Sequence, residues 1–430
     1  MKPRFFLPLV ALGMLQLQAS WTLEHTVSYA LEHNPDLQIA SESIEAAAAK
    51  IEQARSAYRP QIQIESSYTR TNLPLHAFGS ILNQGVFDFG LDFNDPGEVD
   101  NLNVTGSVAL SLYEGGARGA RLKAAEHSFL ASEHQRQAVR QQITFAVIQA
   151  WNQIIQAKEF VASQRSNLHA FETSLEIAQQ QFDAGKFLKI EVLNLEVQVA
   201  RAREGLLNAE HRLELAREAL LNLMGSDDSS LLDHIDPTAE AAATDTDTAA
   251  LEPQTRPELE AMQARVSAAE RNLRAVEAGK APTIQAFANY QLNQGYELDG
   301  DGNHWMAGIS LNYNLYSGGL RENRIREAKA LLRQASSQLR KLELSIELDQ
   351  RNALIAWRNA VEAAQVTSKM VESAEESASL SRSRFESGVI LSSELIDVEN
   401  RLTEARMHRA YAISQVAIAK ANLNRAYGYL

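Results

Sequence analysis

The residue types that most often carry catalysis or metal binding are sparse in this sequence of 430 residues. Because cysteine is absent, thiolate zinc sites, iron–sulfur clusters and a cysteine nucleophile are excluded, and the ten histidines show no close, metal-like spacing. The pairs Gly115-Gly116 and Gly318-Gly319 lack the lysine and the spacing of a phosphate-binding loop, and no nucleophile elbow is present. We therefore expect neither an enzyme nor a bound cofactor or metal.

Two glycine turns carry apolar side chains that could bind another protein. The positions are Gly185, Lys186 and Phe187 in the first turn, and Gly388, Val389 and Ile390 in the second. Exposed apolar residues beside a turn are typical of a docking surface. The alternative is that these side chains pack between neighbouring hairpins.

The two turns are related because the sequence contains one pattern twice. Asn34-Pro35-Asp36-Leu37 returns as Arg256-Pro257-Glu258-Leu259, an offset of 222 residues. Phe182-Asp183-Ala184-Gly185 returns as Phe385-Glu386-Ser387-Gly388, an offset of 203. Chance matches would not keep constant offsets, and one insertion of 19 residues in the first copy explains the difference between them. We predict a first repeat at 20–225, a linker at 226–256 and a second repeat at 257–430.

Each copy contains two stretches in which apolar and polar side chains alternate. The predicted strands lie at about 58–70, 103–113, 282–292 and 304–316. In the second stretch, for example, Val104, Val108 and Leu110 oppose Thr105 and Ser107. A period of two predicts a strand, and this length also fits a membrane β-strand of about 9–11 residues. An ordinary sheet with one wet face is the alternative.

The remaining sequence is typical of long helices. Residues 120–184 and 320–387 contain no glycine or proline and are rich in good helix formers. Each run stops at a single glycine, Gly185 or Gly388, and a second helical run follows it. Each copy is therefore predicted to contain a helix, two strands and a long helical hairpin with its tip near 185 or 388. A soluble coiled-coil rod would share these helices.

The number of strands decides how they could assemble. Four strands cannot close a membrane barrel, because the smallest has about eight and every edge must be paired. If the strands lie in lipid, several chains must contribute to one barrel.

The first twenty residues read as an export signal. Lys2 and Arg4 precede an apolar stretch, and Ala19 stands where a peptidase could cut. We predict a signal peptide at 1–19. The net charge of −13 argues against a nucleic-acid partner, whose phosphates attract basic surfaces.

The order, spacing and duplication of these motifs resemble the TolC-like outer-membrane efflux protein family over nearly all of the mature chain. The matching motifs are Leu23-Glu24-His25-Thr26-Val27, Asn34-Pro35-Asp36-Leu37, Tyr58-Arg59-Pro60, Tyr113-Glu114-Gly115-Gly116, Tyr316-Ser317-Gly318-Gly319, and the two hairpin tips around Gly185 and Gly388.

The resemblance implies a mostly helical homotrimer in the outer membrane of a Gram-negative bacterium. Four strands per chain would give a twelve-stranded barrel in outer-membrane lipid, continued by a long periplasmic helical barrel. It implies a passive exit duct of a tripartite efflux pump or type I secretion system. The partners would be a periplasmic adaptor (membrane fusion) protein, docked at the hairpin tips, and an inner-membrane transporter.

The resemblance also implies a closed aperture at the tips. Its acidic positions correspond to Glu191, Glu394 and Asp397, and its gating tyrosine to Phe385, which lacks the hydroxyl. The gating arginine corresponds to Ile390, so the contacts that close the tip must differ here. A threefold ring of carboxylates would favour cations. The alternative for these carboxylates is a solvated helix face or a charge at a helix N-terminus.

A different function class also fits the helices. A periplasmic coiled-coil adaptor or scaffold without a membrane barrel would share the hairpins, but it would not need four alternating strands at matched places in both copies. Within the duct interpretation, the sequence does not distinguish drugs, metal ions and secreted proteins as substrates.

Overall fold

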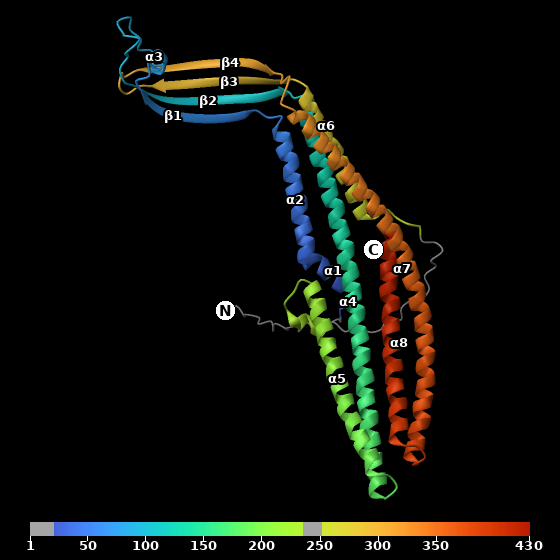
Figure 1. Ribbon diagram of the computed structural model, residues 1–430. Helices are drawn as coiled ribbons and strands as arrows, with labels where there is room; N and C mark the ends of the chain where they lie inside the picture. The colour runs from blue at the N-terminus through green and yellow to red at the C-terminus, as the bar shows by residue number, and fades with distance from the viewer. Residues whose placement is uncertain (1–20, 235–251) are drawn as a thin grey trace, which may run out of the picture. The chain divides into compact units, whose positions relative to one another are not determined.

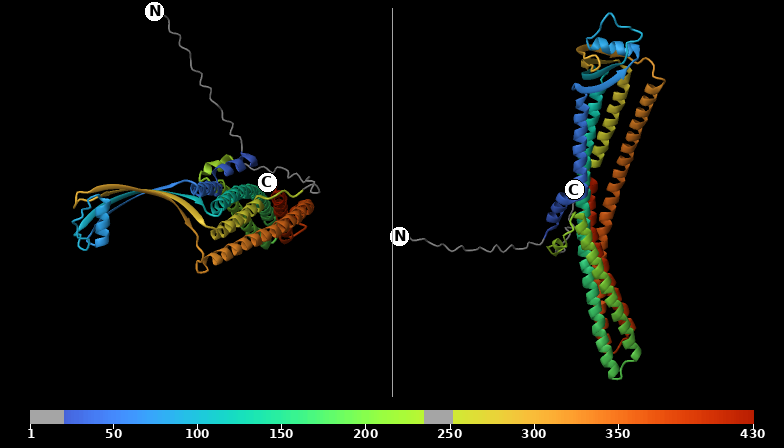
Figure 2. Two further views of the ribbon diagram at one scale, coloured as in Figure 1. Left: turned by 90° about the horizontal axis from the view of Figure 1, so that it is seen from above. Right: turned by 90° about the vertical axis from the view of Figure 1, so that its left-hand side faces the viewer.

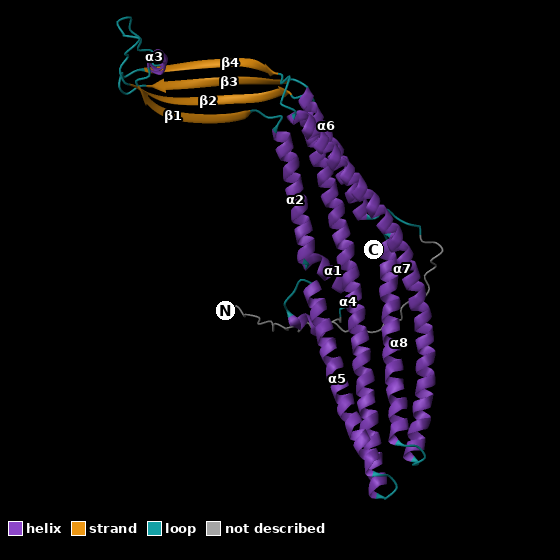
Figure 3. Ribbon diagram, viewed as in Figure 1, coloured by secondary structure: helices purple, strands orange, loops and turns teal. Residues whose placement is uncertain are grey.

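The computed structural model describes residues 21–234 and 252–430, and most of these residues are helical (Figure 1; Figure 3). The predicted signal peptide at 1–19 and residues 235–251 of the predicted linker lie outside the described residues. The chain divides into two compact units. One consists of the described residues within Met1–Ile39, Arg136–Arg256 and Leu344–Leu430; the other consists of Ala40–Gln135 and Pro257–Glu343. Each sequence copy therefore contributes to both units.

The second unit contains one four-stranded sheet. Its strands are β1 (Gln61–Thr71), β2 (Val99–Tyr113), β3 (Thr283–Gln294) and β4 (Asp301–Asn312). The strand order is β1-β2-β3-β4, as Figure 1 shows, and every neighbouring pair is antiparallel. Figure 2 shows the same sheet in two further views. The prediction of a mostly helical fold with four strands in each chain is confirmed. The fourth strand ends at Asn312 rather than at 316, and the second begins four residues earlier than predicted.

The apolar residues of the two edge strands, β1 and β4, are exposed rather than buried within the chain. Ile62 is 74% exposed and Ile309 is 71% exposed, and every residue of β1 except Thr71 is exposed. In a chain that folded alone in water, such a surface would be expected to pack against another layer. The alternation in sequence therefore marks a face that this chain does not cover by itself.

Helix α3 (Pro74–Asn83) lies in the connection between β1 and β2, which is longer than the connection between β3 and β4. Pro74 stands at its first turn, and its buried residues Ala77 and Ile81 pack with Val99 at the start of β2. Phe78 lies edge-on to Phe93, with ring centroids 4.9 Å apart. Packing beneath the connection thus orders a segment whose sequence is too short for a clear helical period.

The turn between β2 and the following helix is tightly packed. Gly115 has φ +60°, and a Cβ there would lie 2.4 Å from Cβ of Ala281 and 2.7 Å from the carbonyl oxygen of Ala278. Only glycine combines this backbone conformation with this approach. The neighbouring elements of the unit are α6 (Pro257–Glu277) and the 3₁₀ helix at Ala278–Lys280.

Two helical hairpins supply most of the first unit. They are formed by α4 (Ala117–Asp183) with α5 (Lys189–Leu223), and by α7 (Leu320–Glu386) with α8 (Ser392–Tyr427) (Figure 1). Helices α4 and α7 have 67 residues each, of which the first parts belong to the other unit. Within the described ranges, none of the helices has the length and apolar character needed to cross a membrane.

Buried apolar residues hold each hairpin together. Ile143, Val147 and Ile154 of α4 pack with Leu220 of α5 and with Met224, the residue after α5. In the second hairpin, Trp357 and Ala360 of α7 pack with Val416 and Leu423 of α8. The three- and four-residue spacing within each helix is the expected spacing of a core-facing stripe.

The segment before β1 forms two helices rather than the single predicted helix. They are α1 (Leu23–His33) and α2 (Pro35–Ser56), and the chain changes direction at Asn34. The Asn34 side chain accepts a hydrogen bond from Asp36 N at 2.8 Å and donates one to the Leu223 carbonyl at 2.8 Å. Asn34 therefore caps α2 and ties it to the end of α5. A 3₁₀ helix at Ser229–His234 follows α5.

Candidate functional site at the hairpin tips

Both hairpin tips close in the same way. Gly185 and Gly388 each have φ +74°, the left-handed conformation that ends many helices. Lys186 N donates to the Gln181 carbonyl at 2.8 Å, and Val389 N donates to the Arg384 carbonyl at 2.8 Å. These bonds satisfy carbonyl groups that the helix ends leave free, so both turns have a defined shape.

A hydrophobic cluster joins the two tips. Its largest fully buried members are Phe171, Leu195, Phe385 and Leu395, and the centroid of the Phe187 ring lies 5.3 Å from that of the Phe385 ring. Phe385, the predicted counterpart of a gating tyrosine, therefore holds the hairpins together through packing and presents no surface to water. Phe182 occupies the same position in the first copy and is 37% exposed.

The predicted docking residues divide into exposed and buried groups. Lys186 and Val389 are exposed, Phe187 is half-buried, and Ile390 is buried in the tip cluster. The expectation that Ile390 is exposed is therefore wrong, because it packs between the hairpins. Leu188 and Leu391 follow these residues at the start of each second helix, and both side chains are exposed.

Glu191 is buried, and its Oε2 accepts a hydrogen bond from the backbone N of Ser392 at 2.7 Å. Ser392 is the first residue of α8, so the carboxylate of one hairpin satisfies a backbone donor at the start of a helix in the other. Within a single chain, Glu191 is therefore a contact between hairpins and not a free carboxylate at the surface.

Glu394 and Asp397 are both exposed on α8. Oε1 of Glu394 lies 3.7 Å from Nη1 of Arg384, and Asp397 pairs with Arg401 one turn further along. Exposed pairs of this kind are weak, and each arginine offsets part of the negative potential of its partner. The two carboxylates can face water at the tip, but they do so beside cations.

An ion pair with one buried partner lies next to the cluster, and it was not predicted from the sequence. Arg382 Nε lies 2.5 Å from Glu399 Oε1, and Arg382 Nη2 lies 2.7 Å from Oε2. The Glu399 side chain is 2% exposed, whereas that of Arg382 is 46% exposed. The hydrogen bond with Glu399 raises the pKa of Arg382, so the guanidinium stays charged. A signal was present in the sequence: Glu399 follows buried Leu395 by four residues and precedes buried Leu402 by three.

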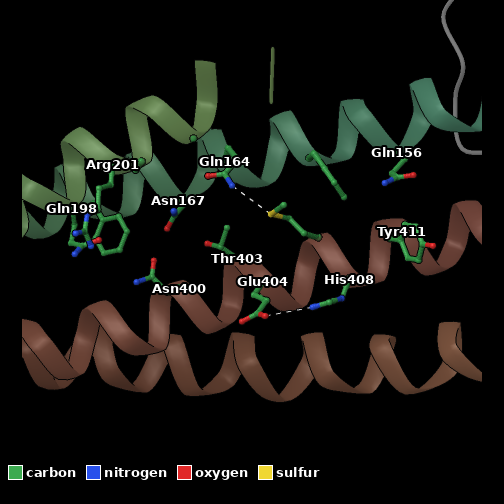
Figure 4. Close-up of a pocket in the computed structure, with 15 residues that line it drawn as sticks. Gln156, Gln164, Asn167, Gln198, Arg201, Asn400, Thr403, Glu404, His408 and Tyr411 are labelled. Carbon is green, nitrogen blue, oxygen red and sulfur yellow. Dashed lines mark hydrogen bonds and ion pairs between the residues drawn. The ribbon is translucent and has the colours of Figure 1, made fainter. Parts of the chain in front are cut away.

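A groove of about 820 Å³ lies along the same hairpins, between α4, α5 and α8 (Figure 4). Asn167 of α4 and Asn400 of α8 point toward one another from its two walls. Asn167 is buried, and its Oδ1 has no hydrogen-bond partner among the residues that the structure describes. Gln164 donates to the sulfur of Met407 at 3.4 Å. The groove therefore offers amide groups for polar contacts. Among the described residues, no group of three His, Asp or Glu side chains could hold a metal ion.

Comparison with known proteins gives one consistent family. The family model described as "Outer membrane efflux protein" matches residues 26–226 and 251–429, which is most of the chain.

Individual relatives are distant but cover most of the length. The outer membrane efflux protein BepC of Brucella suis is 24% identical over 362 residues, covering 82% of this chain and 72% of that protein. The outer membrane protein TolC of Vibrio cholerae is 24% identical over 438 residues, covering 98% of this chain and 94% of that protein. A solved membrane protein from Pseudomonas aeruginosa superposes with a TM-score of 0.81 at 22% identity, covering 94% of this chain and 93% of that one.

Proposed function

Because the chain belongs to the outer membrane efflux protein family, we propose that it is the outer-membrane exit duct of a tripartite efflux pump or a type I secretion system. The protein resides in the outer membrane, with its helical part in the periplasm. The duct passes substrate passively from a periplasmic adaptor and an inner-membrane transporter to the exterior.

The observation that carries this proposal is the sheet with an uncovered apolar face. Ile62 and Ile64 of β1 and Ile309 and Leu311 of β4 are all mostly exposed, as lipid-facing residues of a membrane strand would be. Three chains would supply twelve strands and close the sheet on itself, which leaves no unpaired backbone in lipid. A periplasmic coiled-coil scaffold would give no role to this face.

The hairpin tips are the proposed docking site for the adaptor. Lys186 and Val389, together with Leu188 and Leu391, give each tip exposed apolar or cationic side chains beside a rigid turn. Gly185 and Gly388 set the turn, while Phe187 and Ile390 support it from below. Crosslinking from positions 186 and 389 tests this surface. Products that contain an adaptor are expected, and their absence in intact cells would count against docking at the tips.

The aperture is proposed to lie at the same end. Glu394 and Asp397 supply the carboxylates that face the lumen, whereas Glu191 and Phe385 keep the two hairpins of each chain together. Because each exposed carboxylate has an arginine neighbour, the ring would favour cations less strongly than unpaired acids would.

Single-channel recording in planar bilayers tests the aperture. The double substitution Glu394→Ala and Asp397→Ala is expected to reduce the preference for cations and to change conductance. The control is Glu347→Ala, which removes an exposed carboxylate paired with Arg351 four residues later, away from the tips. Equal conductance and selectivity in the double variant and the control would contradict the placement of Glu394 and Asp397 at the aperture.

A further inference from the structure

The sheet ends in two open edges. Among the described strands, β1 and β4 each pair with a neighbour on one side only. Open edges expose rows of backbone donors and acceptors, and they are the usual sites of pairing with another chain. The proposed function, on which this inference rests, implies that copies of the chain meet there. It does not state which residues pair.

The internal duplication is precise enough to answer that question. In the first hairpin Gln61 lies opposite Ala109, and in the second Thr283 lies opposite Asn312. Adding the repeat offset of 222 to position 61 gives position 283, and adding the offset of 203 to position 109 gives position 312. The two strand hairpins therefore share one register, and both offsets hold inside the strands. No shift of register has accumulated since the duplication.

The pairing of β2 with β3 is the joint between the two copies inside the chain. Val108 lies opposite Ala288, and Ser107 lies opposite Asn289. If two chains pair in the same way, β4 of one chain corresponds to β2, and β1 of the neighbouring chain corresponds to β3. Applying the same two offsets converts the first pair to Leu311 opposite Ser66, and the second to Ser310 opposite Ser67.

The polarity of the two edge strands supports this register independently. It places Ile309 opposite Tyr68, which is an apolar residue against an aromatic one. It places Asn312 opposite Glu65, both polar. A slip of one residue would set Ile309 and Leu311 of β4 against the polar face of β1. The alternation of faces thus excludes slips by an odd number of residues, and the repeat offsets select one of the remaining registers.

We propose that β4 of one chain pairs antiparallel with β1 of a second copy in this register, with Leu311 opposite Ser66. The joint between chains then repeats the joint within each chain. The pairing between neighbouring strand hairpins is then the same within a chain and between chains all around the barrel.

Disulfide crosslinking tests the register, and the absence of cysteine removes any background. The test variant carries Ser66→Cys and Leu311→Cys in the full-length protein in its native membrane. The control variant carries Val108→Cys and Ala288→Cys, which occupy the equivalent pair inside one chain. Two slipped variants combine Leu311→Cys with Ile64→Cys or with Tyr68→Cys.

After mild oxidation, the control is expected to close within one chain, and the test variant is expected to migrate as a covalently linked trimer on a denaturing gel. The slipped variants should stay largely uncrosslinked, because diagonal neighbours lie farther apart than directly opposed residues. Adjacent pairs alternate between two hydrogen-bonding types, so Ser67→Cys with Ser310→Cys, and its control Ser107→Cys with Asn289→Cys, are tested in parallel.

A covalent trimer from a slipped variant would overturn the register, as would the absence of a trimer from both test variants when their controls close. The mass of the uncrosslinked protein in detergent distinguishes a failure of the proposed register from a failure of the proposed function. An oligomer with the wrong register contradicts this inference alone, whereas a monomer contradicts the proposed duct as well.

Discussion

The ion pair between Arg382 and Glu399 provides the sharpest test of how the tip is held together. Replacing Arg382 with alanine removes the cation but leaves the Glu399 carboxylate 2% exposed, with no opposite charge beside it. Breaking a fully buried pair in this way costs about 3–5 kcal/mol. Because the Arg382 side chain is nearly half exposed, water can reach part of the site and lower that cost. We expect about 2–3 kcal/mol.

Amide hydrogen exchange is the suitable assay, because the tip can open without unfolding the rest of the chain. At about 1.4 kcal/mol for each factor of ten, Arg382→Ala should lower the protection of amides near Glu399 by about 30- to 150-fold. Protection near Trp357, which lies in a separate cluster of the same hairpin, should stay unchanged.

A second variant separates the loss of the pair from the cost of a buried charge. The double substitution Arg382→Leu and Glu399→Leu removes both charges and leaves an apolar environment next to buried Leu395 and Leu402. Such replacements are often neutral or stabilising, so protection should return to near the original level. If the double variant were as weakly protected as Arg382→Ala, the reasoning from buried charge would be refuted.

Three further predictions concern single contacts. Glu191→Ala should destabilise the start of α8 by about 1–2 kcal/mol, which would be measured as faster amide exchange there. Glu191→Gln keeps a hydrogen-bond acceptor and should lose less stability. Equal losses of stability in the two variants would contradict the capping role. Phe385→Ala should lower the stability of the tip by about 3–5 kcal/mol in thermal unfolding followed by circular dichroism, because the ring is buried. The matched change Phe182→Ala should cost much less within one chain, and a similar loss would refute the packing account. Gly115→Ala should lower the melting temperature more than Gly116→Ala, because both have positive φ but only the first would bring a Cβ into contact with neighbouring atoms; the reverse order would refute this explanation.

Much of the fold follows from local sequence patterns. Alternating side chains predicted all four strands, because a strand that is apolar on one face repeats every two residues. The long helices were predicted equally directly, since α4 and α7 contain all but the last residue of the two stretches without glycine or proline. The strand ends were less well predicted. In β4 the apolar alternation continues to Leu315, although the last residue with a partner in the sheet is Asn312.

The tips could be predicted only in part, because burial there depends on contacts between distant segments. Glu191 meets the backbone of Ser392, which is 201 residues away, and nothing near Glu191 in the sequence announces that contact. Ile390 follows a glycine turn like an exposed residue, yet the other hairpin covers it. The ion pair of Glu399 could have been predicted, since a charged residue on the buried apolar face of a helix needs a partner of opposite charge.

The central claim is that copies of this chain form a duct through the outer membrane. Its most direct test is to purify the protein from membranes in detergent, measure its mass, and add it to planar lipid bilayers. The account predicts a trimer whose insertion produces discrete conductance steps. A monomer that stays soluble without detergent and produces no current would contradict it.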